Sequence, residues 1–300
     1  MPELPEVQTT VDGLNKTVKG RKILDVWTDY RSGFHAGKDN IKNPAFFKTF
    51  KKQILGTKII GAKRRGKNVL IELSNNKTIL VHMKMTGHLL FGKFVKENNK
   101  WTSAEKGPLT NSFNRFLHLV LELSGGKELA LSDMRKFAKV TLIDTGKYEK
   151  DKELAHLGPD ALELTFPKFK ELIKKEVRPI KQVLIDQEIL AGVGNIYSDE
   201  ALWLAGIHPR SKPICIPDNY LKKLFGAMKK VLRKGINFGG DSMSDYRNIY
   251  GKPGKFQQKH NAYRKTGEGC NKLRCKGKIK RDRFGGRSAH FCPVHQRRFT

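Results

Sequence analysis

The sequence predicts an α+β protein in three parts: an N-terminal helix with an antiparallel β-sandwich over residues 1–145, a helical domain over 155–252 and a small metal-stabilised tail over 260–300. Three observations lead to this prediction. Short β-rich runs separated by turn residues fill the first part, and helical apolar spacing fills the second. The tail is rich in Gly and Lys and poor in aliphatic residues, so burial alone cannot hold it folded, and it carries three of the four cysteines.

The first predicted element is a helix that starts near Pro5, a residue suited to the first helical turn. Its apolar residues recur at helical spacing, so one face can pack on a core and hold the chain end in place. These residues are Val7, Val11, Leu14 and Val18. Taken alone, residues 1–6 fit an ordinary capped helix start equally well.

The same six residues can bring an amine and two carboxylates to one point. If Met1 is removed, Pro2 becomes a secondary amine that can form an imine, next to Glu3 and Glu6. The positive end of the helix dipole should favour the neutral, nucleophilic form of this amine. Such an amine can attack a sugar carbon.

Eight strands follow, without an intervening helix, at residues 22–30, 58–64, 68–73, 78–83, 88–95, 116–123, 128–131 and 137–143. Two hairpins turn at Asn75-Asn76 and at Gly125-Gly126. From residue 166 onward the pattern becomes helical, with helices expected at 168–177, 180–186, 195–205 and 218–236. A cleft is expected between the β domain and the helical domain.

The formal charge of +30, from 59 Lys and Arg against 29 Asp and Glu, indicates a polyanionic partner. Nucleic acid is the leading candidate. An anionic membrane surface is the rival, but no basic amphipathic helix with a broad apolar face stands out. We expect a soluble, intracellular protein, since no apolar run approaches a membrane span and the acidic N-terminus does not resemble a signal peptide. In such a chain the grouped cysteines indicate a metal site rather than disulfides.

A glycine-bearing turn, Gly192-Val193-Gly194, leads into Asn195 at an expected helix N-cap. Free backbone amides at such a helix start suit an anion, and the charge of the chain favours a phosphate. An ordinary helix–turn–helix packing unit is the alternative.

Three motifs in order, MPELPEV, VGNIYSDEAL and GGRSAHFCP, resemble the bacterial formamidopyrimidine-DNA glycosylases over essentially the full length. The resemblance implies a β-sandwich, a helix-two-turn-helix domain and a zinc finger. It also implies a monomeric, cytoplasmic, nucleoid-associated DNA repair enzyme that acts on double-stranded DNA. Such an enzyme excises oxidised purines, chiefly 8-oxoguanine and formamidopyrimidines, and cleaves the abasic strand.

By this resemblance Pro2 attacks C1′ and forms a Schiff base, Glu3 protonates the sugar, and Glu6 helps to organise the site. β-Elimination and δ-elimination of the flanking phosphates follow. Lys67 and Arg287 are implied to contact phosphates close to the lesion. Further implied contacts to the DNA backbone come from His82, Lys181, Asn195 and Tyr263.

The resemblance also assigns residues that fill the space left by an everted nucleotide: Met85, Arg135 and Phe137. From the residues alone, Met85 and Phe137 fit core positions better. The family commonly has Asp-Pro-Arg-Arg-Phe where this chain has Asp133-Met134-Arg135-Lys136-Phe137. Lys136 therefore replaces a bidentate phosphate contact by a point charge. The filler trio favours purine lesions over the oxidised pyrimidines of the related endonuclease VIII branch.

The expected metal ligands of one structural Zn²⁺ are Cys270, Cys275, Cys292 and His295, in the order Cys-x₄-Cys-x₁₆-Cys-x₂-His. The family usually shows Cys-x₂-Cys and a fourth cysteine, so this set departs from it twice. His290 is the competing ligand, expected to point away from Cys292 along a strand. Cys215 lies too far upstream to belong to the finger. A zinc-finger DNA-binding protein without catalysis remains an alternative function.

Overall fold

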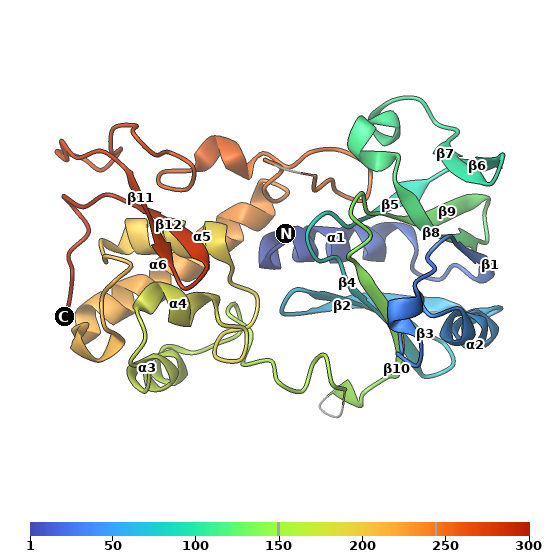
Figure 1. The fold of residues 1–300 in the computed structure, drawn as a ribbon, viewed down its shortest axis with the longest axis horizontal. Helices are drawn as coiled ribbons and strands as arrows, with labels where there is room; N and C mark the ends of the chain where they lie inside the picture. Colours follow the sequence, from blue (N-terminus) through green and yellow to red (C-terminus); the bar gives the residue numbers. More distant parts are fainter. Residues whose placement is uncertain (149–150, 244) are drawn as a thin grey trace. The chain divides into compact units, whose positions relative to one another are not determined.

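The computed structural model describes residues 1–148, 151–243 and 245–300. Within these ranges the chain forms two compact units: Met1–Ala155 with Phe238–Lys255, and His156–Asn237 with Phe256–Thr300. The first unit is drawn mainly in blue and green in Figure 1, and the second mainly in yellow and red. Among all the residues that the structure describes, no helix has the length and apolar character needed to cross a membrane.

Two four-stranded antiparallel sheets form the first unit, in the orders β1-β8-β9-β5 and β10-β4-β3-β2. Their strands are β1 (Ile23–Thr28), β2 (Ile59–Arg65), β3 (Asn68–Leu73), β4 (Lys77–His82), β5 (His88–Gly92), β8 (Leu117–Leu123), β9 (Lys127–Ser132) and β10 (Lys139–Asp144). Both predicted hairpins are present, and Gly125 and Gly126 take the positive φ values of 89° and 68° that their tight turn requires. The predicted antiparallel β domain is therefore confirmed.

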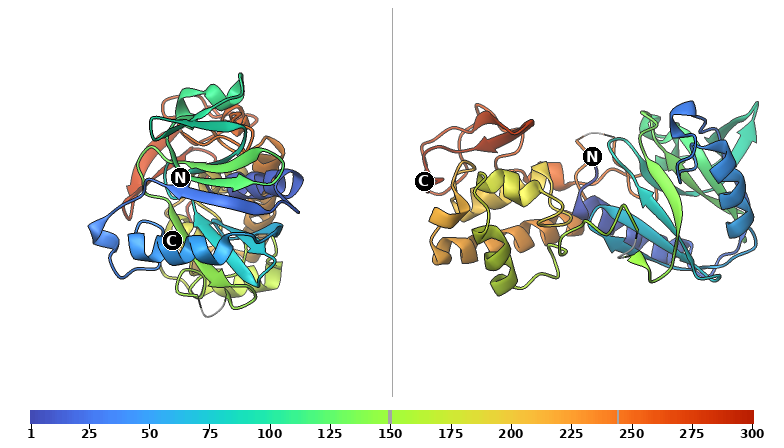
Figure 2. Two further views of the ribbon diagram at one scale, coloured as in Figure 1. Left: turned by 90° about the vertical axis from the view of Figure 1, so that its right-hand side faces the viewer. Right: turned by 60° about the horizontal axis from the view of Figure 1, so that its bottom comes forward.

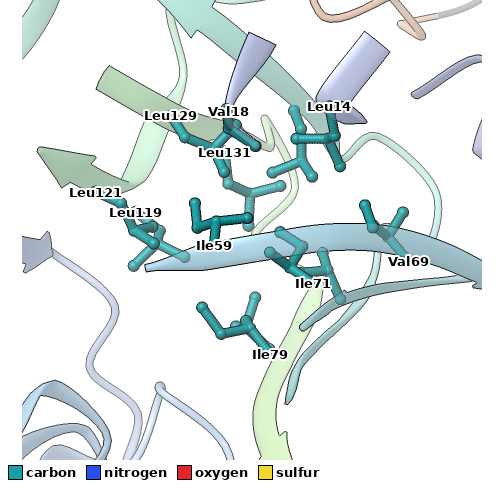
Figure 3. Close-up of a cluster of buried hydrophobic side chains, with 14 of the residues drawn as sticks. Leu14, Val18, Ile59, Val69, Ile71, Ile79, Leu119, Leu121, Leu129 and Leu131 are labelled. Carbon is teal, nitrogen blue, oxygen red and sulfur yellow. The ribbon is translucent and has the colours of Figure 1, made fainter. Parts of the chain in front are cut away.

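The N-terminal helix α1 (Leu4–Thr17) packs its apolar face into the core between the sheets. Figure 3 shows Leu14 and Val18 meeting side chains from both sheets, among them Ile71 and Leu121. Leu14 is fully buried, and burial of such a side chain contributes roughly 1.5–3 kcal/mol. This packing holds the start of the chain in a fixed place.

Two features of the first unit correct the sequence analysis. A helix, α2 (Pro44–Ile54), does intervene among the strands; Asn43 caps it and Pro44 opens it. The expected strand at 88–95 is divided between β5 and a separate hairpin of β6 (Phe94–Glu97) and β7 (Lys100–Ser103). Asn98 and Asn99 turn this hairpin with φ values of 48° and 62°, the conformation that asparagine tolerates best after glycine.

Residues 238–252 were expected within the helical domain, but the segment Phe238–Lys255 belongs to the first unit. The backbone amide of Phe91 donates to the carbonyl of Ile249 at 2.7 Å, and the side-chain Nδ2 of Asn114 donates to the carbonyl of Gly251 at 3.2 Å. Ile249 also packs so closely on Gly13 that a Cβ there would lie 2.4 Å from its Cγ2. The segment is thus part of the β domain in packing, although it is distant in sequence.

Four helices build the second unit: α3 (Phe166–Lys174), α4 (Ile180–Ile185), α5 (Asn195–Ala205) and α6 (Asp218–Asn237). Proline stands at the start of α3 and α4, as expected. A hairpin of β11 (Lys280–Phe284) and β12 (Arg287–Phe291) completes it and lies against α5 in Figures 1 and 2. Short 3₁₀ turns occur at Gly33–His35, Pro108–Thr110, Ser112–Asn114, Pro213–Cys215 and Phe256–Lys259.

Candidate active site, nucleic-acid interface and metal centre

The start of α1 is buried. Pro2 lies inside the first unit, and Glu3 and Glu6 are only 4% and 2% exposed. A reciprocal capping box joins the two carboxylates to the helix start, and the amide of Glu3 donates to Oε2 of Glu6 at 2.7 Å. The structure therefore brings the predicted amine-bearing residue and both carboxylates to one point.

Glu6 is also held by the segment Phe238–Lys255. The amide of Asp241 donates to its Oε1 at 2.7 Å, and the hydroxyl of Tyr246 donates to its backbone carbonyl at 3.0 Å. Burial, followed by the nearby Glu6 charge, raises the pKa of Tyr246, so this hydroxyl stays protonated. Gly240, at a φ of 85°, leaves room for Glu6, since a Cβ there would lie 2.9 Å from Glu6 Cγ. Sequence reasoning assigned no role to Tyr246.

Lys67 lies in the turn between β2 and β3 and is only 6% exposed, so its side chain is packed within the protein and is not a solvated surface charge. His82 ends β4, where burial in the first place, and repulsion from Lys84 and Lys67 in the second, lower its pKa to about 3. Its Nδ1 accepts from the amide of Lys84 at 3.0 Å. The neutral ring therefore carries its proton on Nε2, which can donate to a phosphate oxygen.

The three predicted filler residues meet across two loops of the first unit. The guanidinium of Arg135 lies 3.2 Å from Sδ of Met85 and 4.4 Å from the ring centroid of Phe137. Met85 and Phe137 are 46% and 47% exposed, so neither is a core residue. With Met1 and Lys136, the trio helps to line a hollow of about 600 Å³. The fillers thus border the same hollow as the chain end that carries Pro2.

Asp133 organises these loops, and sequence reasoning gave it no role. Its carboxylate is fully buried and accepts from the hydroxyls of Tyr30 and Thr86 and from the amide of Ala138. Thr86 Oγ1 in turn accepts from the amide of Arg135 at 3.1 Å. The only signal in the sequence was an acidic residue at the head of the quoted loop motif. Its burial could not be read from spacing.

Asn195 is the first residue of α5, and Gly194 is the N-cap, so the predicted N-cap assignment of Asn195 was wrong by one residue. The side-chain Oδ1 of Asn195 has no hydrogen-bond partner within the ranges that the structure describes. Asn195 lines a hollow of about 380 Å³ with Arg281, Arg283 and Arg287. This is a strongly cationic setting beside a helix start, as a phosphate site requires.

Lys181 does not lie at that surface. It is fully buried, and its ammonium donates to the carbonyl of Asn195 at 2.9 Å, to Oγ of Ser198 at 2.7 Å and to Oδ1 of Asp199 at 2.6 Å. With its three protons donated inside the protein, Lys181 has none left for a phosphate. The prediction of a direct Lys181–phosphate contact is corrected accordingly: Lys181 supports the turn that presents Asn195.

Arg287 stands exposed at the first position of β12, directly after the turn Gly285-Gly286. Both glycines have positive φ, and a Cβ at Gly285 would lie 2.6 Å from Nε2 of Gln182 on α4. Glycine therefore allows the hairpin tip to sit on α4. Tyr263, also in the tail, is half-buried, and the centroid of its ring lies 5.1 Å from that of His290 on β12.

The four predicted metal ligands cluster. One donor atom each from Cys270, Cys275, Cys292 and His295 lies within 4.8 Å of the others. The Sγ atoms of Cys275 and Cys292 are 3.6 Å apart, near the separation of about 3.8 Å that two thiolates have on tetrahedral zinc. A Cβ at Gly277 would lie 2.6 Å from the Cys292 sulfur, so glycine leaves space around the centre. The residues present fit a Zn²⁺ ion.

Surrounding groups orient the ligands. Nε2 of His295 lies 2.9 Å from the carbonyl of Trp203, which as an acceptor fixes the proton there and leaves Nδ1 as the donor atom for a metal. Nδ1 of His290 lies 3.0 Å from Oδ2 of Asp199, so this ring nitrogen is engaged by a carboxylate outside the cysteine cluster. The expected reason, that His290 points away from Cys292 along a strand, was wrong, because residues two apart on a strand share a face. The cluster that could hold a metal thus contains His295, and His290 is bound to Asp199 instead.

Comparisons with known proteins agree with this geometry. Residues 1–140 match the model of the formamidopyrimidine-DNA glycosylase N-terminal domain, and residues 157–247 match that of the formamidopyrimidine-DNA glycosylase H2TH domain. A formamidopyrimidine-DNA glycosylase of Herpetosiphon aurantiacus is 37% identical over 298 residues, which cover 99% of this chain and 100% of the relative. One of Carboxydothermus hydrogenoformans is 34% identical over 299 residues, with the same coverage.

Solved structures give the same result. The Lactococcus lactis Fpg in complex with abasic-site-containing DNA matches with a TM-score of 0.83 at 30% identity, covering 99% of this chain and 100% of that one. A G226P mutant of that protein with Fapy-dG-containing DNA matches equally well. Because family models match residues 1–140 and 157–247, and a relative is 37% identical over 99% of the chain, the chain belongs to the formamidopyrimidine-DNA glycosylase family.

Proposed function

We propose that this protein is a DNA repair enzyme that excises oxidised purines, chiefly 8-oxoguanine and formamidopyrimidines, from double-stranded DNA and then cleaves the abasic strand. The observation that carries the proposal is the buried start of α1, which holds Pro2 with Glu3 and Glu6. The lesion-containing DNA bound to related proteins supports this substrate class. As a monomer acting on chromosomal DNA, the enzyme would work in the cytoplasm at the nucleoid.

In the proposed reaction Pro2, freed by removal of Met1, attacks C1′ with its nitrogen lone pair. The glycosidic bond breaks, and the damaged base leaves with its electron pair and takes up the proton that the Pro2 nitrogen loses. Glu3 donates a proton to the ring oxygen as the C1′–O4′ bond opens and the iminium forms. The iminium acidifies the C2′ proton. Loss of that proton expels the 3′ phosphate, a second elimination expels the 5′ phosphate, and water releases the sugar fragment from Pro2.

The nucleotide must leave the base stack before Pro2 can reach it, at a cost of a few kcal/mol. The half-exposed side chains of Met85 and Phe137 would take the vacated space and offset lost stacking, while Arg135 would bond to the orphaned base. This trio supports purine lesions over oxidised pyrimidines as substrates.

Phosphates of the lesion strand would be bound by Lys67 and His82 in the first unit, and by Asn195, Arg287 and, more weakly, Tyr263 in the second. The charge of +30 supports a binding energy dominated by such contacts. Lys136 adds a half-exposed point charge beside the fillers. Zn²⁺, held by Cys270, Cys275, Cys292 and His295, would supply folding energy to the tail that presents Arg287.

Borohydride trapping tests the proposal. The protein should form a covalent adduct, mapping to Pro2, with a duplex that contains 8-oxoguanine opposite cytosine. A thymine-glycol duplex should trap less; stronger trapping there would indicate an endonuclease VIII-like substrate range. A protein that retains Met1, in which the Pro2 nitrogen is an amide, is the control. If it trapped as efficiently as the wild type, Pro2 would not be the nucleophile. DNA binding without any trapping would indicate a non-catalytic zinc-finger protein.

A further inference from the structure

A single buried carboxylate joins three elements of the second unit. Asp199 is 1% exposed; its Oδ1 accepts from the ammonium of Lys181 at 2.6 Å. Its Oδ2 lies 3.0 Å from both the amide nitrogen and Nδ1 of His290. Lys181 is 0% exposed and His290 is 6% exposed, so the whole cluster is removed from solvent. It includes no metal ligand and no atom assigned to the reaction above.

The elements joined in this way are those that carry the expected phosphate contacts. Lys181, on α4, also binds the carbonyl of Asn195 and Oγ of Ser198, which form the first turn of α5. His290, on β12, lies three residues from Arg287, and the regular pairing of β12 with β11 transmits its position to the hairpin tip. Asp199 therefore connects the turn bearing Asn195 to the strand bearing Arg287.

Burying charges is costly, and a buried ion pair gives little net stability compared with apolar side chains of the same shape. The Lys181–Asp199 pair is fully hydrogen-bonded, so its main effect is to hold α4, α5 and β12 in one relative position. Asn195 and Arg287 line the same cationic hollow of about 380 Å³. The distance between them matters because both must meet one DNA backbone.

We propose that Asp199 is a positioning residue for DNA backbone binding: through Lys181 and His290 it sets the spacing of Asn195 and Arg287. The inference rests on the proposed function only in requiring that the protein binds duplex DNA. Asp199 itself touches no DNA. The effect of replacing Asp199 on DNA affinity should therefore depend on the presence of Arg287. A role of Asp199 in stability alone would not produce this dependence.

A double-mutant cycle tests this. Affinity for a duplex carrying a tetrahydrofuran abasic analogue is measured by fluorescence anisotropy for wild type, Asp199→Asn, Arg287→Ala and the double variant, with the folded fraction and zinc content measured in parallel. Asp199→Asn should weaken binding about tenfold and flatten the log–log salt dependence by about 0.9 for one lost phosphate contact. The double variant should bind within about twofold of Arg287→Ala alone.

Asp282→Asn is the matched control, because it removes an exposed ion pair between Arg210 and the same hairpin, with side chains 42% and 41% exposed. It should leave affinity and salt dependence unchanged. If Asp199→Asn does not fold, Lys181→Met with Asp199→Leu removes the buried pair without leaving a lone charge, and it takes the place of Asp199→Asn in the cycle.

Additive losses in the cycle, or a folded variant with an unchanged salt dependence, would overturn the role of Asp199. Failure of the wild type to bind the abasic-analogue duplex would instead contradict the proposed function. The two failures are thus distinguishable in one experiment.

Discussion

The hydroxyl of Tyr30 donates a hydrogen bond to Oδ2 of Asp133 at 3.1 Å, linking the chain just after β1 to the loop that presents Arg135 and Phe137. The same carboxylate accepts from Thr86, on the loop that presents Met85. The filler residues are consequently held on two loops by one buried group. Half-exposed apolar side chains need such support, because their own burial does not fix them.

Replacing Asp133 by Asn should therefore loosen the fillers. We expect excision of 8-oxoguanine from duplex DNA to fall about tenfold, equivalent to about 1.4 kcal/mol. Cleavage of a preformed abasic site should fall less, since no base has to be everted. Single-turnover kinetics on the two substrates measure this. Tyr30→Phe removes only one hydrogen bond, worth about 1 kcal/mol, and should have a smaller effect. Equal losses on both substrates would contradict the role of the loops.

Glu3→Gln should depress base excision more than cleavage of a preformed abasic site, because the amide cannot donate the proton needed for sugar ring opening. Rates of base release and strand cleavage are measured separately on matched duplexes. Asp12→Asn, a change on the exposed side of α1, is the control and should alter neither rate. An unaffected rate of base release in Glu3→Gln would remove Glu3 from the proposed mechanism.

His82 should make the protein less stable in mild acid. Its pKa in the folded protein is about 3, mainly because of burial, against about 6.5 in an unfolded chain. Between these values the unfolded chain binds the additional proton, so the free energy of unfolding falls as pH falls, by up to about 1.4 kcal/mol per pH unit. His88, with a pKa lowered to about 4 by burial, acts in the same direction.

Urea unfolding between pH 6.5 and 5 measures this dependence. His82→Gln should reduce the slope by the contribution of one histidine, and the slope that His88 contributes should remain. In DNA binding, the contribution of His82 should not change between pH 6 and 8, because the ring is neutral throughout. An unchanged stability slope in His82→Gln would show that the ring is protonated in the folded state.

Metal analysis should find one zinc ion per chain, lost in His295→Ala and retained in His290→Ala. Chelation should unfold the tail and abolish DNA binding while circular dichroism still reports the folded β domain, since the described core residues of that domain include none from the tail. Full activity in protein shown to be free of zinc would contradict a structural metal and would leave the β11–β12 hairpin to present Arg287 unaided.

Asn195→Ala should weaken binding to damaged and undamaged duplexes alike, because a phosphate contact carries no base information. Titrations at several salt concentrations measure it, and each lost contact should reduce the log–log slope by about 0.9. A loss confined to one type of lesion would contradict the phosphate role of Asn195.

The sequence by itself determined the elements and the chemistry that depend on local pattern. Helical spacing from Val7 to Leu14 predicted α1, the glycine pair at 125–126 predicted a hairpin, and cysteine spacing with His295 predicted the metal cluster. These follow from the sequence because backbone conformation and ligand spacing are set by residues close together in the chain.

Only the tertiary structure decided which polar groups are buried and what they bind. Lys181 was expected at the DNA surface, yet it is enclosed by Ser198 and Asp199. Asp133 supports two loops, although the loop motif showed only an acidic residue and not its burial. The segment Phe238–Lys255 joins the β domain and holds Glu6. Burial depends on contacts between residues far apart in the chain, and a charged side chain carries the same letter whether it faces phosphate or a buried carboxylate.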